Sequence, residues 1–316
     1  MNNKRIINLA DYLRKEGFFF NDKELSSGDN SKRIILEIKK ADRNFLAYSI
    51  PNKNVKLESN MAKEVMALKA IEEQKSELSH IVPRVVQYSK EDHWFIRESL
   101  DGNICGNVYS FDKQFYTERH LKELVLMLKF LRSIKLDGLE SITVSDLVAT
   151  LQNMVEKNYY DKTKLNKAIR LYEENKKLIE DPAKKSFLHK DLQPTNLLVG
   201  PDGNLALVDF EKSAQGNYCY DFVSLYHRGD GNPKWQEEFK NAFANSLNES
   251  FSDVVFLVFY SYVLFLDIVS LDLVYLKKAI KPFHHTNLTD IEARELMAEY
   301  EIKLEQILND LGDKNG

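Results

Sequence analysis

The fold of this 316-residue chain is decided by the stretch Phe187-Leu-His-Lys-Asp-Leu-Gln-Pro-Thr-Asn-Leu-Leu-Val199 and by Val208-Asp-Phe-Glu211 shortly after it. The pattern predicts two short strands, 196–199 and 205–208, joined by a turn at Gly200-Pro-Asp-Gly203, because these residue types favour turns. In the first stretch an aspartate precedes an asparagine by five residues, and the second stretch adds another aspartate. We therefore expect three oxygen-bearing side chains to converge on one site.

These three side chains suit phosphoryl transfer, which needs metal ions over the phosphates and a carboxylate that orients the acceptor hydroxyl. Magnesium prefers oxygen ligands and shares them with phosphates, so the amide of Asn196 and the carboxylate of Asp209 are its predicted ligands. Asp191 is then left to orient or deprotonate the acceptor. We expect His189 to brace the loop through hydrogen bonds rather than to act as a base.

The order H-x-D-x-x-x-x-N followed by V-D-F-E resembles the aminoglycoside phosphotransferase and choline kinase family, a branch of the protein-kinase-like fold. The resemblance implies an α+β, two-lobed fold, with an antiparallel β N-lobe that carries one helix and a mostly helical C-lobe. It also implies a magnesium-dependent enzyme that uses ATP or GTP to phosphorylate a hydroxyl of an aminoglycoside-, choline- or sugar-like small molecule. A protein kinase is a weaker prediction, since no Ala-Pro-Glu motif follows.

Two further acidic residues follow from this resemblance. Asp221, in Tyr220-Asp-Phe-Val-Ser-Leu225, matches a family aspartate and is expected to hold the local backbone. Glu211 either assists the metal or the acceptor, or faces solvent; both alternatives stay open here.

The pattern of elements also predicts two lobes. Two apolar runs, 33–39 and 44–50, indicate a hairpin; helical spacing follows over 60–74, and two more short strands are expected at 81–88 and 94–98. From about residue 111 the pattern is helical. We therefore predict an N-lobe over 1–98, a hinge over 99–102 and a C-lobe over 103–316, with nucleotide bound in the cleft.

The N-lobe half of the site has one departure from the family. Glu64 matches the helix glutamate that pairs with a phosphate-binding strand lysine, but the expected lysine position is occupied by Ser49. The backbone near Glu98 and Leu100 would bond the adenine edge.

A serine hydroxyl cannot neutralise phosphate charge as an ammonium does. Either the strand register differs, or Lys53, Lys56 or Arg33 supplies the cation, or catalysis is weakened. The alternative function is thus a nucleotide-binding regulator, a pseudokinase with weak or no turnover.

Bulk composition excludes other classes. The formal net charge is −4 with both signs interleaved, which disfavours nucleic acid as a partner. The two cysteines, Cys105 and Cys219, lie far apart, as in a reduced cytoplasmic protein. The N-terminal residues lack the apolar core of a signal peptide, so a cytoplasmic location is expected.

The most apolar stretch, 254–273, contains two aspartates, which makes it a predicted core helix rather than a membrane span. The acceptor pocket is expected among the helices of 110–180 and 230–310. Several acidic residues there would suit a cationic acceptor, although surface solvation explains them equally well: Asp230, Glu237, Glu238, Asp267 and Asp272.

Overall fold

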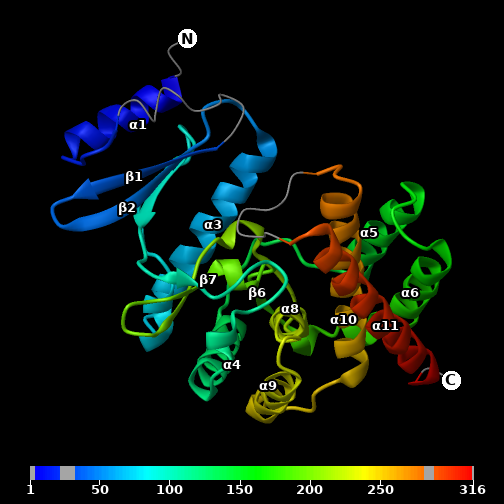
Figure 1. The fold of residues 1–316 in the computed structure, drawn as a ribbon. Helices are drawn as coiled ribbons and strands as arrows, with labels where there is room; N and C mark the ends of the chain where they lie inside the picture. Colours follow the sequence, from blue (N-terminus) through cyan, green and yellow to red (C-terminus); the bar gives the residue numbers. More distant parts are fainter. Residues whose placement is uncertain (1–3, 22–32, 281–287, 315–316) are drawn as a thin grey trace. The chain divides into compact units, whose positions relative to one another are not determined.

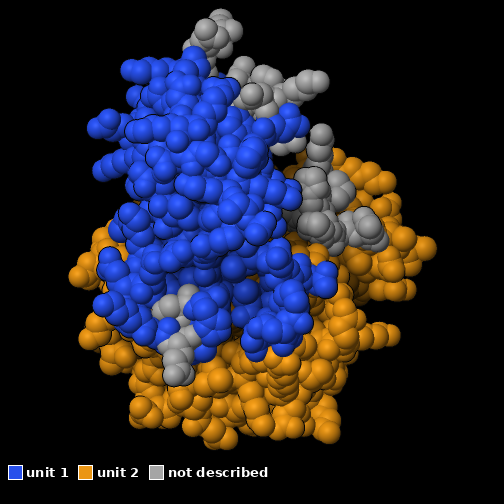
Figure 2. Space-filling view, turned by 90° about the vertical axis from the view of Figure 1, so that its left-hand side faces the viewer, with its two compact units in different colours: residues 1–103, 198–213 blue, residues 104–197, 214–316 orange. Residues whose placement is uncertain are grey.

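The computed structural model describes residues 4–21, 33–280 and 288–314. Residues 24–30, a small polar segment with one glycine whose composition favours a turn, lie outside these ranges. The chain divides into two compact units, residues 1–103 with 198–213 and residues 104–197 with 214–316, coloured blue and orange in Figure 2. The segment 198–213 thus belongs to the first unit, whereas we expected all of 103–316 to form the second.

The first unit contains a four-stranded antiparallel sheet in the order β1-β2-β4-β3. Helices α1 and α3 lie on opposite faces of this sheet (Figure 1). Its elements are α1 (Lys4–Lys15), β1 (Ile34–Lys40), β2 (Arg43–Ser49), α3 (Val55–Glu73), the 3₁₀ turn η1 (Glu77–Ile81), β3 (Val85–Ser89) and β4 (Trp94–Glu98).

Strand β2 is buried on both faces. Phe45 and Ala47 belong to the apolar cluster that includes α1, while Tyr48 belongs to the cluster that includes α3. Successive strand residues point to opposite faces, so each side chain of β2 is assigned to one helix or the other. This double coverage leaves no polar face in the strand's sequence.

Helix α3 begins at a capped end. The side-chain oxygen of Asn54 accepts a hydrogen bond from the backbone N–H of Leu57 at 3.2 Å, which satisfies one of the unpaired donors of the first turn. Met61 and Val65 then recur at a spacing of four residues and face the sheet. Glu64 is therefore carried on the buried side of the helix, where it is 2% exposed.

The hairpin of β7 (Leu197–Val199) and β8 (Leu205–Leu207) has the predicted turn. The N–H of Gly203 donates to the carbonyl of Gly200 at 2.8 Å, and Gly203 has a φ of +76°, a conformation that favours glycine. The 3₁₀ turn η5 (Phe210–Lys212) follows. It packs against α3, and β8 packs against η1, which is why this segment joins the first unit.

The second unit is mostly helical. Its main elements are α4 (Glu118–Ser133), α5 (Val144–Glu156), α6 (Lys162–Glu174), α7 (Lys176–Ile179), β6 (Lys185–Leu188), β9 (Ala214–Asn217), α8 (Cys219–Arg228), α9 (Pro233–Ser246), α10 (Asp253–Leu271) and α11 (Asp290–Lys314). The described residues of this unit also form the short helical turns η2 (Lys113–Phe115), η3 (Pro182–Lys184), η4 (Pro194–Asn196) and η6 (Asp272–Leu276), and the short strand β5 (Asn103–Ile104) lies at its boundary with the first unit. Strands β6 and β9, which the sequence pattern did not predict, pair antiparallel.

Helix α10 forms the centre of the second unit and packs against α8 and α11 (Figure 1). Among the described residues, the helical run Asp253–Leu276 is the one that is long and apolar enough to cross a membrane, but 78% of its most apolar window is buried within the protein. That burial is the property of a core helix, as the interrupted apolar pattern predicted. Cys105 and Cys219 are both free and buried.

Candidate active site

The loop that carries Asp191 is held by a buried carboxylate. Both oxygens of Asp221, on the first turn of α8, accept backbone hydrogen bonds: from the N–H of His189 at 2.7 Å and from that of Lys190 at 2.9 Å. Lys190 has a φ of +67°, a conformation that non-glycine residues adopt only where their surroundings hold them. Asp221 therefore lies against the backbone that we expected it to hold.

Two more side chains act on the same loop. The backbone N–H of Asp191 donates to Nδ1 of the fully buried His189 at 3.3 Å. Asn196, on η4, donates through Nδ2 to the backbone carbonyl of Asp191 at 2.9 Å and to its Oδ2 at 3.3 Å. The amide of Asn196 thus fixes the orientation of the Asp191 carboxylate, and its nitrogen faces that residue.

Burial affects the charge of Asp221. Removal from water raises the pKa of this carboxyl to about 7, whereas the two backbone N–H donors favour the ionised form and oppose the rise. The nearby carboxylate of Asp191 adds to the rise.

In the first unit, Arg33 forms an ion pair with Glu211 and interacts electrostatically with Asp209. Asp209 has a φ of +68° and precedes the turn η5. Arg33 Nη1 lies 2.6 Å from Glu211 Oε2 in a partly buried ion pair. Although burial lowers the pKa of Arg33, the carboxylates of Glu211, Glu64 and Asp209 raise it above its ordinary value. Glu211 is therefore bound to an arginine and does not simply face solvent.

Glu64 is paired, but with an arginine of β4 rather than with a lysine. Its Oε1 lies 3.6 Å from Nε of Arg97, which is itself buried. Arg97 also donates through Nη2 to the hydroxyl of Tyr48 at 2.6 Å. Burial raises the pKa of Glu64 to about 7; Arg97 and Arg33 lower it, whereas Asp209 and Glu211 add to the rise.

The placement of Ser49 beside Glu64 is wrong by one residue. Ser49 pairs with Ile34 and Trp94 across the sheet, and both neighbours belong to the cluster on the α1 face. It is fully buried there, whereas Tyr48 faces α3. Because neighbouring strand residues alternate, a register error of one residue exchanges the faces.

The predicted hinge follows the end of β4. The Glu98 side chain forms ion pairs with Arg43 and, at 3.1 Å, with Arg84. Its backbone N–H donates to the carbonyl of Arg84 at 2.9 Å, and its carbonyl accepts from Arg97 Nη1 at 3.4 Å. Leu100 is partly buried.

Asn196 in the second unit and Asp209 in the first each carry an oxygen of the kind that magnesium binds. Asn196 offers an amide oxygen, because its nitrogen is turned to Asp191, and Asp209 offers a carboxylate. Within the described ranges no three His, Cys, Asp or Glu side chains form a group that could hold a metal ion. Magnesium is commonly held by one or two carboxylates together with substrate phosphates, so a complete cage of acidic side chains is not needed.

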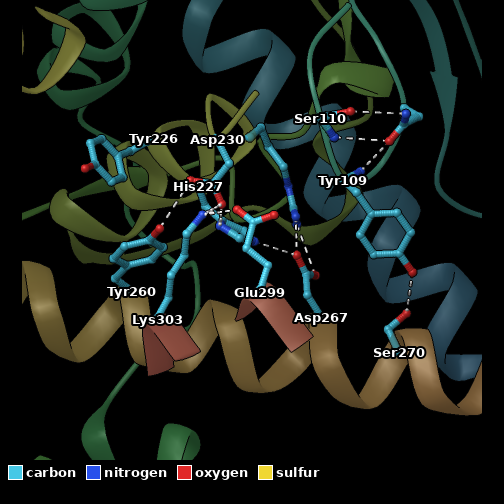
Figure 3. A network of polar contacts seen from close by, with 12 residues as sticks. Tyr109, Ser110, Tyr226, His227, Asp230, Tyr260, Asp267, Ser270, Glu299 and Lys303 are labelled. Atoms are coloured by element: carbon cyan, nitrogen blue, oxygen red, sulfur yellow. Dashed lines mark hydrogen bonds and ion pairs between the residues drawn. The ribbon is translucent and has the colours of Figure 1, made fainter. Parts of the chain in front are cut away.

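The acidic residues proposed for a cationic acceptor are engaged in ion pairs or hydrogen bonds. Figure 3 shows Lys303 of α11 and His227 of α8 directed at Asp230, while Asp267 approaches His227 from α10. Lys303 Nζ lies 2.9 Å from Asp230 Oδ2, and Asp267 binds the guanidinium of Arg228 through both oxygens.

The other three acids lie nearer the surface. Asp272 pairs with Lys277 at 2.6 Å, and Glu238 pairs with Lys234 at 3.7 Å. Glu237 accepts a hydrogen bond from the side-chain amide of Asn241 at 3.3 Å. Because these carboxylates already interact with side chains of the protein, they are weak evidence for a cationic acceptor.

Three functional candidates escaped prediction or were left among alternatives. Arg33 was one of three possible cations; Lys53 and Lys56, the other two, are exposed. Tyr48 and Arg97 were not singled out. An arginine inside the otherwise apolar run Trp94-Phe-Ile-Arg97 was the available signal, since a charge is rarely buried without a partner.

Comparisons with known proteins identify the family of the chain. The family model APH, described as the phosphotransferase enzyme family, matches residues 30–252. No curated protein matches the chain in a sequence search.

Several solved structures share the fold. The choline kinase LicA from Streptococcus pneumoniae, also solved in complex with AMP, has a TM-score of 0.60 at 14% identity and covers 88% of this chain and 89% of its own. The macrolide 2'-phosphotransferase MphH from Brachybacterium faecium has a TM-score of 0.57 at 13% identity, and the match covers 93% of this chain and 97% of that protein. An aminoglycoside phosphotransferase from Alicyclobacillus acidocaldarius has a TM-score of 0.55 at 16% identity, and the match covers 94% of this chain and 96% of that protein. The predicted kinase-like α+β fold is confirmed.

Proposed function

Because this chain belongs to the phosphotransferase enzyme family, we propose that it transfers the γ-phosphate of ATP or GTP to a hydroxyl group of a small molecule. Membership makes the protein a small-molecule phosphotransferase, as the motif order predicted. The nucleotide, the acceptor class and the residue roles are our proposal. The supporting observation is the fixed Asp191 loop, in which Asp221 accepts two backbone N–H bonds and Asn196 holds the Asp191 carboxylate.

Asp191 is the proposed catalytic base. The acceptor oxygen forms a bond to the γ-phosphorus, the bond from that phosphorus to the β,γ-bridging oxygen breaks, and the acceptor proton passes to the Asp191 carboxylate. ADP or GDP leaves with the electron pair. A carboxylate whose orientation is fixed before the acceptor binds loses little freedom during the reaction, which favours the step.

Asn196 and Asp209 are the proposed magnesium ligands. When bound, the metal neutralises charge on the phosphates. In the first unit, we propose that the backbone of Glu98 and Leu100 bonds the adenine edge and that Glu64 positions a phosphate-binding cation. Buried free thiols and the use of nucleoside triphosphates fit a cytoplasmic location.

The acceptor class is open among aminoglycoside-, choline- and sugar-like hydroxyl compounds. The structures similar to this chain include a choline kinase, a macrolide 2'-phosphotransferase and an aminoglycoside phosphotransferase. The paired state of Asp230 and Asp267 gives no preference for a cationic member of this set. A panel with neutral sugars as well as cationic compounds is therefore the appropriate screen.

The test is ADP release with magnesium across that panel, for the wild type, Asp191→Asn and a matched control, Asp202→Asn. Asp202 lies on the exposed turn between β7 and β8. We expect Asp191→Asn to lower kcat by about 10²- to 10⁴-fold, the range for loss of a general base, and the control to keep wild-type kcat. Turnover that survives Asp191→Asn would contradict the assigned mechanism.

A nucleotide-binding regulator is the second candidate, and Tyr48 in place of a strand lysine is the observation that favours it. The wild type, Asp191→Asn and Asp202→Asn samples also decide between the phosphotransferase and the regulator. Magnesium-dependent binding of ATP without phosphorylation of any panel member would support the regulator.

A further inference from the structure

The face of β2 that meets α3 has no lysine. Its residues are Leu46 and Tyr48, and the strand ends at Ser49 on the opposite face. Tyr48 is 5% exposed and stacks on Phe95 with ring centroids 4.6 Å apart. A phosphotransferase still needs a cation beside the nucleotide phosphates, so another element of the first unit has to supply it.

Two arginines flank the ring of Tyr48. The guanidinium carbon of Arg97 lies 5.1 Å from the ring centroid, and that of Arg33 lies 5.5 Å from it. Both arginines interact electrostatically with Glu64. Two guanidinium groups, one from β4 and one from the residue just before β1, thus flank the position that a strand lysine would occupy.

The guanidinium of Arg97 lies in the protein interior. Arg97 is 6% exposed, and its nitrogens contact the Tyr48 hydroxyl, the Glu98 carbonyl and the Glu64 carboxylate. Nη1 and Nη2 donate hydrogen bonds, whereas Nε lies 3.6 Å from the Glu64 carboxylate without one, and this depth of burial keeps the guanidinium from a ligand. Arg97 is therefore a positioning residue that holds Glu64 and the inner side of the sheet together.

Arg33 is placed differently. Its side chain is 28% exposed, and its ion pair with Glu211 uses Nη1. A guanidinium has five N–H donors in a planar fork that matches phosphate oxygens, so this ion pair leaves donors for a ligand. Arg33 also interacts with Asp209, the proposed magnesium ligand.

We propose that Arg33 binds the phosphates of the nucleotide in the role expected of a strand lysine, while Arg97 takes over that lysine's pairing with Glu64. The two tasks that one lysine performs in the family pattern are divided between two arginines in this chain. Glu211 holds the Arg33 guanidinium beside Asp209, so the cation is already in position when nucleotide binds. This inference rests on the proposed phosphotransfer and assigns its phosphate-binding residue.

The test compares binding of ADP and of adenosine by titration calorimetry, with magnesium present. A cation that meets phosphates contributes to ADP affinity and not to adenosine affinity. We expect Arg33→Ala to weaken ADP binding by about 10- to 100-fold, the range for a hydrogen bond to a charged group, and to leave adenosine binding within about twofold. Arg33→Lys keeps the charge and is expected to recover part of the ADP affinity.

Arg14→Ala is the matched control. Arg14 also forms an ion pair with a carboxylate, that of Asp11 at 3.4 Å, and its guanidinium carbon lies 5.6 Å from the centroid of a ring, that of Phe20. The variant is expected to bind ADP and adenosine like the wild type. If Arg33→Ala misfolds, the Arg33→Lys and Arg14→Ala samples still decide, because a purely structural arginine would change both ligands' affinities together.

Two results would overturn the assignment: Arg33 variants with the wild-type ratio of ADP to adenosine affinity, or loss of that ratio in Arg97→Ala alone. Failure of the proposed function is a separate result. It would appear as absence of Asp191-dependent transfer, whereas ADP binding would still depend on Arg33.

Discussion

Removal of the Asp267 side chain is expected to destabilise the second unit strongly. Asp267 lies on α10 and accepts three contacts from α8: His227 Nε2 at 3.0 Å, Arg228 Nη2 at 3.2 Å and Arg228 Nη1. His227 is fully buried and Arg228 is 8% exposed. Despite its burial, the neighbouring Arg228 and His227 hold the pKa of Asp267 below its ordinary value.

Asp267→Ala would leave a guanidinium buried without this carboxylate. Removing one partner of a buried ion pair is strongly destabilising, by about 3–5 kcal/mol, because the remaining charge is desolvated and uncompensated. Asp267→Asn keeps the shape and one acceptor oxygen but not the charge, so we expect a smaller loss. The same network anchors the C-terminal end of α8, whose first turn carries Asp221.

Urea unfolding is the assay. The chain has two tryptophans, Trp94 in the first unit and Trp235 in the second, so a Trp94→Phe background reports on the second unit by fluorescence. The matched control is Glu238→Ala, which breaks an exposed pair with Lys234 at 3.7 Å. Such pairs contribute about 0.5 kcal/mol or less. A loss below about 1 kcal/mol for Asp267→Ala would refute the assigned cost of the buried network.

Two other predictions concern the same helix. Asp221→Ala removes the acceptor of the His189 and Lys190 backbone N–H groups. We expect a loss of about 1–3 kcal/mol in the free energy of unfolding for each donor left unpaired, measured by urea unfolding, and a lower kcat, measured from initial rates. A variant with wild-type kcat would contradict the role of Asp221 in holding the Asp191 loop. Burial disfavours the His227 imidazolium, but Asp230 and Asp267 raise its pKa above the ordinary 6.5, so its contribution is complete below pH 6.5 and is lost as pH rises through the raised pKa. The stability difference between the wild type and His227→Gln should therefore shrink from pH 6 to pH 9 in urea unfolding; a difference independent of pH would exclude this titration.

The Asp191 loop of the second unit follows closely from local sequence. Asp191 and Asn196 are five residues apart on one loop, so their contact needs only the short turn η4 between them. Asp221 could be assigned from its place after the second motif, and its two bonds reach the backbone of that loop. Spacing along the chain determines such contacts because few conformations of a short loop satisfy them.

The surroundings of Glu64 in the first unit could not be predicted in the same way. Both faces of β2 are buried, one under α1 and one under α3, so its sequence lacks the polar–apolar alternation that would show which residues share a face with Glu64. Without that alternation, the face of the sheet to which each residue points can be assigned wrongly by one position. This is the error made for Ser49. The pairing of Tyr48 with Phe95 in the folded sheet corrects it.

The sequence by itself thus determined the family, the kinase-like fold class and the predicted roles of the motif residues, because motif order and spacing are properties of the chain alone. The tertiary structure decided which cations meet the acidic groups. Arg33 and Glu211 are separated by 178 positions and Arg97 and Tyr48 by 49, and no local rule brings such residues together. Only the packing of the sheet and of η5 against α3 places these arginines beside Glu64, where a lysine was expected.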